Sequence, residues 1–485
     1  MKRLMVEDIR GAVKGRWHRR GEPVAAEGVS IDSRSAGAEN LFVAIRGQKF
    51  DGHDFLAQAA AAGCIAAIVN RDAPLDEDVL SGFTGGVIGV ADTTTALGDL
   101  ATYYRNGLAA TIVAVTGSNG KTTVKGMIHH ILSSCLKGTA SPASYNNSIG
   151  VPLTLLSADA GDDYVICEVG TNAPGEIADL VRIVRPDVAV ITSVACAHLA
   201  GLGDIERVAA EKAALLGGLT PGGIGVVWAD SKPLAAAMRA YDARVIRFGA
   251  DESAELRLTR YLPACGKRAG EPDPGKGRFE LNGWLWVDLA VPGRHNALNA
   301  LAAMAVARRF GLDIESAAAA IGDFTGQEMR LQKIEAGGVT IINDAYNSNP
   351  ASLLAGAEAL ASFSGKRRVV VAADMLELGP DSEALHRRTG EALAKVGVDL
   401  VVGVGPMGRH IAAGAAAANV ETEEIKSVRL ACKGLPDMLK RGDVVLLKGS
   451  RLMAMERLVG PIEAAFARPR KGRRTVKKKR RVRKC

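Results

Sequence analysis

The sequence has no paired cysteines and no long apolar run. Its seven cysteines stand singly, without a CxxC pair, and an odd number cannot all join in intramolecular disulfides. We therefore expect free thiols, mostly small buried side chains, in a reducing cytoplasm. No segment approaches the roughly 18 to 20 consecutive apolar residues of a membrane-spanning helix, and the first eleven residues lack the apolar core of a signal peptide. The sequence predicts a soluble, cytoplasmic protein.

Internal repeats are also absent, which argues against solenoids and propellers. With 485 residues, of which 47% are hydrophobic, the chain is too long for one ordinary domain and is able to bury several cores. We expect domains at residues 1–108, 109–325 and 326–467, followed by a basic tail at 468–485. The fold class expected for all three domains is α/β.

The net charge of +8 arises at the end of the chain. The segment 468–484 holds 12 Lys or Arg residues and no acidic residue, and subtracting these 12 from +8 leaves −4 for the remainder. A mildly acidic body does not indicate a nucleic-acid surface. The tail is expected to be a disordered, solvated extension, with binding to nucleic acid or to an anionic surface as the alternative.

Apolar runs between turn signals predict the strands. In the first domain, runs at 40–45 and 64–69 flank a helix-like segment at 55–62. In the second, continuous apolar runs suit parallel strands buried on both faces, at 110–115, 164–169, 187–194 and 224–229. In the third, similar runs alternate with helix-length segments, as in a Rossmann-like domain, at 339–343, 369–373, 400–404 and 444–448. Residues 265–278, rich in Gly, Pro and charge, are expected to form a surface excursion.

A glycine-rich turn follows the run at 110–115. It reads Thr116-Gly117-Ser118-Asn119-Gly120-Lys121-Thr122-Thr123, and apolar residues recur after it at helical spacing, at Val124, Met127, Ile128, Ile131 and Leu132. Strand, glycine turn and amphipathic helix are the order of a phosphate-binding loop, in which backbone N–H groups face the anion. Lys121 would supply a charge for the β and γ phosphates, and Thr122 a hydroxyl for Mg²⁺. The spacing departs from GxxxxGK[ST], because position 115 is Val.

Two further polar side chains come after predicted strands. Glu168 lies near the end of the run at 164–169, and His198 follows the run at 187–194. The carboxyl ends of parallel strands meet at one edge of a sheet, so both side chains are expected beside the phosphate loop. Chemistry on ATP needs Mg²⁺ held by hard oxygen ligands, and an acyl phosphate forming between two anionic groups calls for a second ion. Taken alone, a carboxylate or histidine at such a position is more often a structural group than a metal ligand. Three candidate groups at one edge of the sheet nevertheless favour a Mg²⁺ site beside the phosphate loop, with a second ion if an acyl phosphate is to form.

Four motifs, spread over two hundred residues, resemble the Mur ligase superfamily. They are TGSNGKTT at 116–123, EVGTNAPGEI at 168–177, AHLAGLGD at 197–204 with Glu211 and Lys212 downstream, and GRHNALNALAA at 293–303. The resemblance implies a three-domain architecture with a central phosphate-loop ATPase domain and a Rossmann-like C-terminal domain. It also implies the reaction: ATP converts a carboxylate to an acyl phosphate, an amine attacks it, and an amide forms. The protein then mostly positions groups and neutralises charge.

The resemblance assigns roles to individual residues. Thr122 and Glu168 match ligands of one Mg²⁺, His198 matches a ligand of the second, and Lys212 matches the lysine that the superfamily carbamylates. His295, Asn296 and Asn299 match contacts to adenine, while Arg330 and Asp344 match residues that reach the ATP phosphate and ribose, so closure of the third domain would complete the site. The expected ATP-binding set is Gly117, Ser118, Asn119, Gly120, Lys121, Thr122, Thr123, His295, Asn296, Asn299, Arg330 and Asp344. The expected catalytic set is Lys121, Glu168, His198, Lys212 and Arg330.

Segments outside this shared core resemble one branch of the superfamily, which joins D-alanyl-D-alanine to a UDP-N-acetylmuramoyl tripeptide. They are YNNSIGVPL at 145–153, NDAYNSNP at 343–350 and DMLELG at 374–379. In the first domain, DSR at 32–34, LFVA at 41–44 and DGHDF at 51–55 resemble a UDP-sugar-binding domain. A Ser-Arg pair after a strand, as in KGSR at 448–451, suits phosphate or carboxylate binding. The expected substrate contacts are Ser33, Arg34, Asn146, Asn147, Thr171, Tyr346, Asn347 and Ser450.

Two departures and two alternatives accompany this interpretation. The superfamily often has Glu where this chain has Ala200, and Gly where it has Met329. One alternative is the branch that adds the third amino acid, although its usual DNPR or DDPR motif is absent. The other is a phosphate-loop protein that binds nucleic acid through its tail, with ATP as a switch. The expected protein is a monomeric, Mg²⁺-dependent ligase of cell-wall precursor synthesis.

Overall fold

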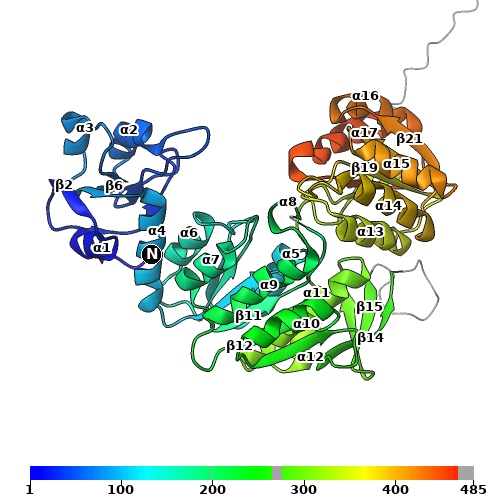
Figure 1. Cartoon of the computed structure of the whole chain (residues 1–485), viewed down its shortest axis with the longest axis horizontal. Helices are drawn as coiled ribbons and strands as arrows, with labels where there is room; N and C mark the ends of the chain where they lie inside the picture. The colour runs from blue at the N-terminus through cyan, green and yellow to red at the C-terminus, as the bar shows by residue number, and fades with distance from the viewer. Residues whose placement is uncertain (198, 265–275, 468–485) are drawn as a thin grey trace, which may run out of the picture.

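The computed structural model describes residues 1–197, 199–264 and 276–467. Three α/β units follow one another along the chain, each with its own sheet, and the middle unit lies between the other two (Figure 1). This confirms the predicted fold class. The candidate ligand His198 and the basic tail at 468–485 lie outside the described residues, as do residues 265–275. In the described part of the chain, no helix has the length and apolar character needed to cross a membrane.

The first unit is built on a five-stranded sheet. Its order is β2 (Arg16–Arg20), β7 (Gly86–Val90), β6 (Ala66–Asn70), β5 (Leu41–Val43) and β4 (Val29–Ser30). Only β2 runs antiparallel to its neighbour. The short strands β1 (Leu4–Met5) and β3 (Ala25–Ala26) pair separately, and the helices are α1 (Val6–Ala12), α2 (Leu56–Ala61) and α3 (Glu77–Ser81). The strands predicted at 40–45 and 64–69 and the helix at 55–62 are confirmed, with ends shifted by a few residues.

A long helix, α4 (Thr93–Asn106), leads into the middle unit and packs against its helices α6 (Gly150–Ser157) and α7 (Glu176–Val184). The buried side chain of Arg105 fixes this junction, because its guanidinium donates to the carbonyl of Val184 at 3.0 Å and to Asp187 at 3.0 Å. Burial lowers the pKa of Arg105, and Asp187 partly offsets that effect. The first unit is therefore attached to the middle unit by helix packing and by a buried ion pair.

The middle unit has a nine-stranded sheet with β8 (Thr111–Thr116) inside it. On one side of β8 lie β10 (Tyr164–Glu168) and the edge strand β9 (Gly138–Ala140). On the other side come β11 (Val188–Ile191), β12 (Ile224–Trp228), β13 (Val245–Gly249), β14 (Leu256–Leu262), β15 (Gly277–Leu281) and β16 (Leu285–Leu289). All pairings are parallel except the last two. The four predicted strands of this domain are confirmed.

Apolar side chains cover both faces of this sheet. One face packs against α5 (Lys121–Leu132), α11 (Arg294–Arg309) and α12 (Ile314–Gly322). The other packs against α4, α6, α7, α9 (Ile205–Ala213) and α10 (Lys232–Ala237). The chain leaves β8 toward β9 and β10 and later crosses to β11 on the opposite side. The carboxyl end of β8 is thus the point where the strand order reverses, which is where open α/β sheets bind ligands.

One prediction for this unit is partly wrong. The surface excursion predicted at 265–278 ends earlier, because β15 begins at Gly277 and lies between β14 and β16. Alternate side chains of this strand, Phe279 and Leu281, are buried in the core, whereas Arg278 is paired with Asp288 at 2.9 Å. One face of this short strand carries the charged residues Arg278 and Glu280, so the apolar signal is weak, and the Gly, Pro and charged residues before it hide where the strand begins.

The third unit has a six-stranded sheet. Its order is β17 (Gln332–Ala336), β18 (Val339–Asn343), β22 (Asp443–Lys448), β19 (Arg367–Ala373), β20 (Leu400–Val404) and β21 (Glu421–Ile425), and only β17 is antiparallel. One face packs against α13 (Pro350–Ala359), α14 (Ser382–Lys395) and α15 (Gly408–Ala417), the other against α16 (Val428–Met438) and α17 (Val459–Phe466). The four predicted strands are confirmed. The polar edge strands β17 and β21 were not predicted.

Candidate active site

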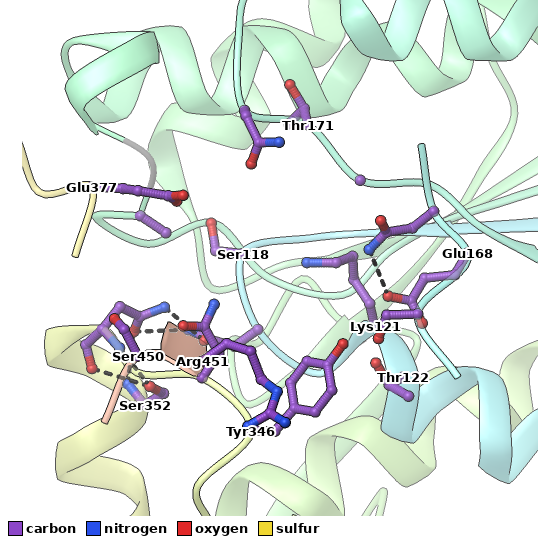
Figure 2. Close-up of a pocket in the computed structure, with 18 of the residues that line it drawn as sticks. Ser118, Lys121, Thr122, Glu168, Thr171, Tyr346, Ser352, Glu377, Ser450 and Arg451 are labelled. Carbon is purple, nitrogen blue, oxygen red and sulfur yellow. Dashed lines mark hydrogen bonds between the residues drawn. The ribbon is translucent and has the colours of Figure 1, made fainter. Parts of the chain in front are cut away.

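A cavity of about 460 Å³ opens between the middle and third units at the carboxyl end of β8 (Figure 2). Its middle-unit wall comes from the glycine turn after β8 and the segments beside β10, and its other wall comes from the third unit. Most of the predicted site residues line it: Ser118, Asn119, Gly120, Lys121, Thr122, Asn146, Asn147, Glu168, Thr171, Arg330, Tyr346, Asn347 and Ser450. The structure thus brings together side chains that are more than 300 residues apart in the sequence.

The glycine turn is held rigidly by the segment that follows β11. Ser118 donates its backbone N–H to the carbonyl of Ser193 at 2.9 Å, and Asn119 N–H donates to the Ser193 hydroxyl at 2.9 Å. A Cβ on Gly117, whose φ is 150°, would lie 1.9 Å from the Thr192 hydroxyl oxygen. This close approach requires glycine at position 117. The segment after β11 therefore helps to fix the geometry of the loop.

Lys121 begins helix α5, and its ammonium donates to the carbonyl of Gly117 at 2.8 Å, which folds the side chain over the turn. Burial lowers the pKa of Lys121, although the nearby Glu168 carboxylate acts in the opposite direction. In the next position, the Thr122 hydroxyl accepts from the Arg330 guanidinium at 3.2 Å. Arg330 also stacks on the Tyr346 ring, with 4.0 Å between its guanidinium carbon and the ring centroid. An arginine at the start of the third unit therefore reaches the phosphate loop of the middle unit.

Glu168 offers a carboxylate suited to a cation. Its side chain is 1% exposed, and one oxygen, Oε1, accepts from the Asn146 amide at 3.1 Å. The other oxygen, Oε2, has no hydrogen-bond partner and lies 3.4 Å from the Lys125 ammonium. A buried carboxylate, together with the Thr122 hydroxyl, offers the hard oxygen ligands that Mg²⁺ prefers. Among the described residues, no group of three His, Cys, Asp or Glu side chains forms a metal site, and His198 lies outside them.

Lys212 sits in helix α9 with a side chain that is 2% exposed. Burial, and to a smaller extent the nearby Lys121 charge, lower its pKa to about 7, with Glu211 partly opposing both effects. Glu211 itself is turned toward helix α7, where it accepts the backbone N–H groups of Gly175 and Ile177, both at 2.8 Å. A solvent-exposed helix lysine, which position 212 suggests without the resemblance, is therefore excluded.

The three residues expected to contact adenine stand at the start of helix α11, against the phosphate loop. A Cβ on Gly120, whose φ is 84°, would lie 2.4 Å from the Asn299 side-chain oxygen, so this residue packs on the loop itself. Asn299 donates to Asn296 at 3.0 Å, and Asn296 donates to the carbonyl of Pro292 at 2.7 Å. Burial lowers the pKa of His295 to about 4, which keeps the imidazole neutral near pH 7. None of the three lines the cavity described above.

Asp344 follows β18 and holds the segment that connects the second and third units. One of its carboxylate oxygens accepts the Leu331 backbone N–H at 3.2 Å, and the other pairs with the buried ammonium of Lys448. Met329 and Leu331, on either side of Arg330, adopt φ values of 55° and 52°. Left-handed backbone is unfavourable for side chains of this size, so the superfamily's preference for Gly where this chain has Met329 is understandable. The segment around Arg330 is thus strained, and its hydrogen bond to Asp344 holds it in place.

The predicted substrate contacts fall into two places. Asn146, Asn147, Thr171, Tyr346, Asn347 and Ser450 line the central cavity. Ser33 and Arg34 instead lie in the first unit and do not line it: the Ser33 hydroxyl donates to Gln58 at 3.0 Å, and Arg34 pairs with Asp32 at 2.6 Å. That exposed pairing lowers the pKa of Asp32 to about 2. A long substrate would be needed to reach both places.

Several residues of the cavity region were missed from the sequence. The Asn349 amide donates to Asn119 of the phosphate loop at 2.8 Å, which joins the third unit to the middle one. The backbone N–H of Ala200, in the short helix α8 (Leu199–Leu202), donates to the carbonyl of Glu377 at 3.0 Å, and this bond needs no particular side chain at position 200. Lys125 follows Lys121 by one helical turn, a spacing that indicates a shared face. Lys448 lies in the KGSR segment, whose signal was assigned to the Ser-Arg pair at 450–451.

Comparisons with known proteins agree with this geometry. Family models match three stretches of the chain: "Mur ligase family, catalytic domain" at residues 26–105, "Mur ligase middle domain" at 115–307 and "Mur ligase, glutamate ligase domain" at 329–451. A UDP-N-acetylmuramoyl-tripeptide--D-alanyl-D-alanine ligase of Bacillus subtilis is 32% identical over 94% of this chain and 97% of its own length.

Solved structures give the same result. MurF from Acinetobacter baumannii superimposes with a TM-score of 0.84 at 30% identity, covering 96% of this chain and 99% of its own. MurF from Thermotoga maritima, solved in complex with ADP, superimposes with a TM-score of 0.77 at 28% identity, covering 91% and 98%. The chain therefore belongs to the Mur ligase family, in the branch of the UDP-N-acetylmuramoyl-tripeptide--D-alanyl-D-alanine ligases.

Proposed function

We propose that this ligase joins D-alanyl-D-alanine to a UDP-N-acetylmuramoyl tripeptide with hydrolysis of ATP, giving the pentapeptide precursor of peptidoglycan, ADP and phosphate. The observation that supports this most is the cavity itself. There the phosphate loop and the Glu168 carboxylate of one unit face Arg330, Tyr346 and Ser450 of the next. This is the arrangement that a transfer between a nucleotide and a second bound substrate requires.

The bond changes follow from the chemistry of a carboxylate, which is a poor electrophile. An oxygen of the tripeptide's terminal carboxylate attacks the γ-phosphorus, and ADP departs with the electron pair of the broken P–O bond. The amine of the dipeptide, as a free base, then attacks the acyl carbon. The resulting tetrahedral species loses phosphate to leave an amide, and the former amine nitrogen gives up a proton.

The chain's own cations would stabilise this sequence. Lys121 and Arg330 flank the phosphate loop and would neutralise charge on the transferred phosphoryl group. In binding a phosphate, the Lys121 ammonium would exchange its present contact with the Gly117 carbonyl for the anion. The backbone N–H groups of the turn and the start of helix α5 would add fixed dipoles. Ser450, which follows β22, would orient the incoming dipeptide.

Mg²⁺ fits the oxygen atoms present, and bound there it would supply positive charge to the phosphates. Thr122 and Glu168 would hold one ion, and Lys212 as a carbamate would help to hold a second, together with His198 outside the described residues. Carbamylation needs a neutral amine, and a pKa of about 7 provides one. The resulting carbamate would remove one of the buried positive charges beside Lys121.

The remaining site residues, the domain bounds and the cellular location are also proposed. His295, Asn296 and Asn299 would contact adenine and Asp344 the ribose, while Ser33 and Arg34 would bind the UDP part. The domains are proposed at 1–108, 109–325 and 326–467, with the tail at 468–485 separate from catalysis. A cytoplasmic monomer is proposed, in keeping with the free thiols of the five cysteines in the described ranges.

The test is phosphate release by the purified protein with ATP and UDP-N-acetylmuramoyl tripeptide, with and without D-alanyl-D-alanine. We expect release to depend on the dipeptide and the pentapeptide product to appear in equal amount. Stimulation by a free diamino acid with the shorter, dipeptide-bearing precursor, and none by D-alanyl-D-alanine, would overturn the proposal in favour of the branch that adds the third amino acid.

A further inference from the structure

A second lysine of helix α5 is buried beside the cavity, and none of the chemistry above uses it. Lys125 lies one turn beyond Lys121, and its side chain is 4% exposed. Its ammonium donates to the carbonyl of Ser141 at 2.8 Å and to the carbonyl of Ala143, and it lies 3.4 Å from Oε2 of Glu168. The Lys125 ammonium therefore connects its own helix, which follows the phosphate loop, with the Glu168 carboxylate at the end of β10 and with a third segment of the chain.

That third segment runs from β9 to helix α6 and carries Asn146 and Asn147 into the cavity. It contains a strained position, since Ala143 has a φ of 44°, in the left-handed region that disfavours residues with a side chain. Such backbone persists where surrounding contacts hold it, and it clusters at functional sites. The carbonyl of this strained residue is one of the two that Lys125 binds.

Glu168 is connected to the same segment from its other side. The Ser141 hydroxyl accepts the Glu168 backbone N–H at 2.9 Å, and the Asn146 amide donates to Glu168 Oε1 at 3.1 Å. The Gly170 N–H donates to the Asn146 carbonyl at 2.7 Å. With Lys125, these bonds close a ring of contacts in which Lys125 supplies the only positive charge among the side chains named.

We propose that Lys125 is a positioning residue: it fixes the strained turn at Ala143 against Glu168, so that Asn146 and Asn147 are held in place to receive the acceptor substrate. The proposal rests on the proposed function, because it assigns this segment to the tripeptide-bearing substrate. It makes Lys125 the connection between the helix of the ATP site and the acceptor site. A lysine that only filled the core would not need three polar partners on two other segments.

The charge matters as well as the hydrogen bonds. An ammonium that gives two of its protons to carbonyls is oriented, and its remaining proton faces the carboxylate oxygen that has no hydrogen-bond partner. The Lys125 ammonium therefore keeps Oε2 of Glu168 turned toward itself, and Oε1 remains the acceptor of the Asn146 amide. Without the cation, the carboxylate and the strained turn would both lose their common anchor.

The first measurement needs no substrate. We compare hydrogen exchange of the ligand-free protein in residues 143–149 for wild type, Lys125→Met and the control Lys137→Met, whose lysine is 64% exposed and pairs with Asp159 on the surface. We expect exchange in this segment to accelerate about tenfold or more in Lys125→Met only, because two hydrogen bonds from a charged group are lost. Unchanged exchange in a folded Lys125→Met protein would overturn the proposal.

The second measurement separates positioning from a general loss of structure. In Lys125→Met, the KM of the UDP-N-acetylmuramoyl tripeptide is expected to rise about tenfold or more, while the KM of ATP rises by a clearly smaller factor, through the loosened Glu168 carboxylate. A purely structural lysine would lower the melting temperature and leave both KM values of the folded enzyme alike. Equal changes in the two KM values therefore contradict the proposal.

Lys125→Arg keeps the cation but alters the position of its donors, so we expect an acceptor KM between those of wild type and Lys125→Met. This variant is used if the methionine variant does not fold. An acceptor KM equal to that of wild type, together with unchanged hydrogen exchange in residues 143–149, would then contradict the proposal. Failure of the proposed function is recognised separately. In that case wild type itself shows no dipeptide-dependent phosphate release, whereas the exchange result for Lys125 stands independently of any substrate.

Discussion

Replacing Lys212 with methionine should stabilise the protein and abolish its activity. Among the described residues, only the Glu211 charge raises the pKa of the buried ammonium, and burial together with the Lys121 charge lowers that pKa to about 7. Methionine keeps a flexible apolar stem of similar length and removes the charge. A site that costs stability and is nevertheless occupied by lysine is explained if the amine is used chemically.

The magnitude follows from the two protonation equilibria. In the unfolded chain a lysine has a pKa of about 10.4, so between pH 7 and that value the unfolded state binds more protons than the folded one. Stability therefore rises with pH across this window, and the penalty is fully present below pH 7. At pH 7 the penalty is about 4 kcal/mol, and the fraction of neutral amine rises from about one in 2,500 in the unfolded chain to about one half in the folded protein.

Calorimetry in buffer free of carbon dioxide tests the first half of the prediction. We expect the transition of the middle domain in Lys212→Met to move up by about 10 °C at pH 7, and by much less at pH 10. The exposed Lys232→Met serves as a control and should not move. A Lys212→Met protein that melts lower than wild type at pH 7 would refute the argument from burial.

Activity measurements test the second part of the prediction, the loss of ligase activity without Lys212. Dipeptide-dependent phosphate release should be lost in Lys212→Ala, should not return with excess bicarbonate, and should return in part with short carboxylic acids that replace the carbamate. Wild-type protein in ¹³C-labelled bicarbonate should show a carbamate resonance that Lys212→Ala lacks. Full activity of Lys212→Ala would remove this lysine from the mechanism.

Four further outcomes are expected. Arg330→Lys should lower kcat about 100-fold, measured by single-turnover phosphate release, because it loses the stacking on Tyr346 and the planar contact to Thr122. A double-mutant cycle of Asn119→Ala and Asn349→Ala should show a coupling of about 1 kcal/mol in the unfolding free energy. ADP affinity by calorimetry should show no step near pH 6.5 from His295, whose depressed pKa keeps it neutral down to about pH 4. Deleting residues 468–485 should leave kcat and both KM values unchanged, whereas loss of activity would support a role of the tail in catalysis.

The central site was predictable because its signals are local. A buried strand, a glycine turn and an amphipathic helix adjoin in the sequence, and the rule that parallel strands share a carboxyl edge placed Glu168 beside the loop. The contact of Asn349 with Asn119 was not predictable, since it joins residues 230 positions apart and depends on how two units meet. Strands such as β17 and β21 were missed because edge strands with polar faces lack an apolar run.

Lys212 shows where local signals fail. Its neighbour Glu211 suggests an exposed pair on a helix, yet successive helical residues point about 100° apart. In the structure Glu211 turns to the start of helix α7, and Lys212 turns inward. Both side chains are buried, and this depends on how α7 packs against α9, a contact that no pattern around residue 212 encodes. The burial of Lys125 is decided in the same way, by the turn at Ala143.

The distribution of charge around the cavity gives these separate lysines a common physical meaning. Lys121, Lys125, Lys212 and Arg330 surround the phosphate loop, whereas Glu168 is the carboxylate that lies among them. An excess of enclosed positive charge costs stability in the absence of a ligand. It becomes favourable when a triphosphate and a substrate carboxylate enter, because the opposing charges already lie around the loop and only local contacts, such as that of Lys121 with the Gly117 carbonyl, are exchanged. The cost in stability of enclosing these cations is thus a consequence of preparing the site for anionic substrates.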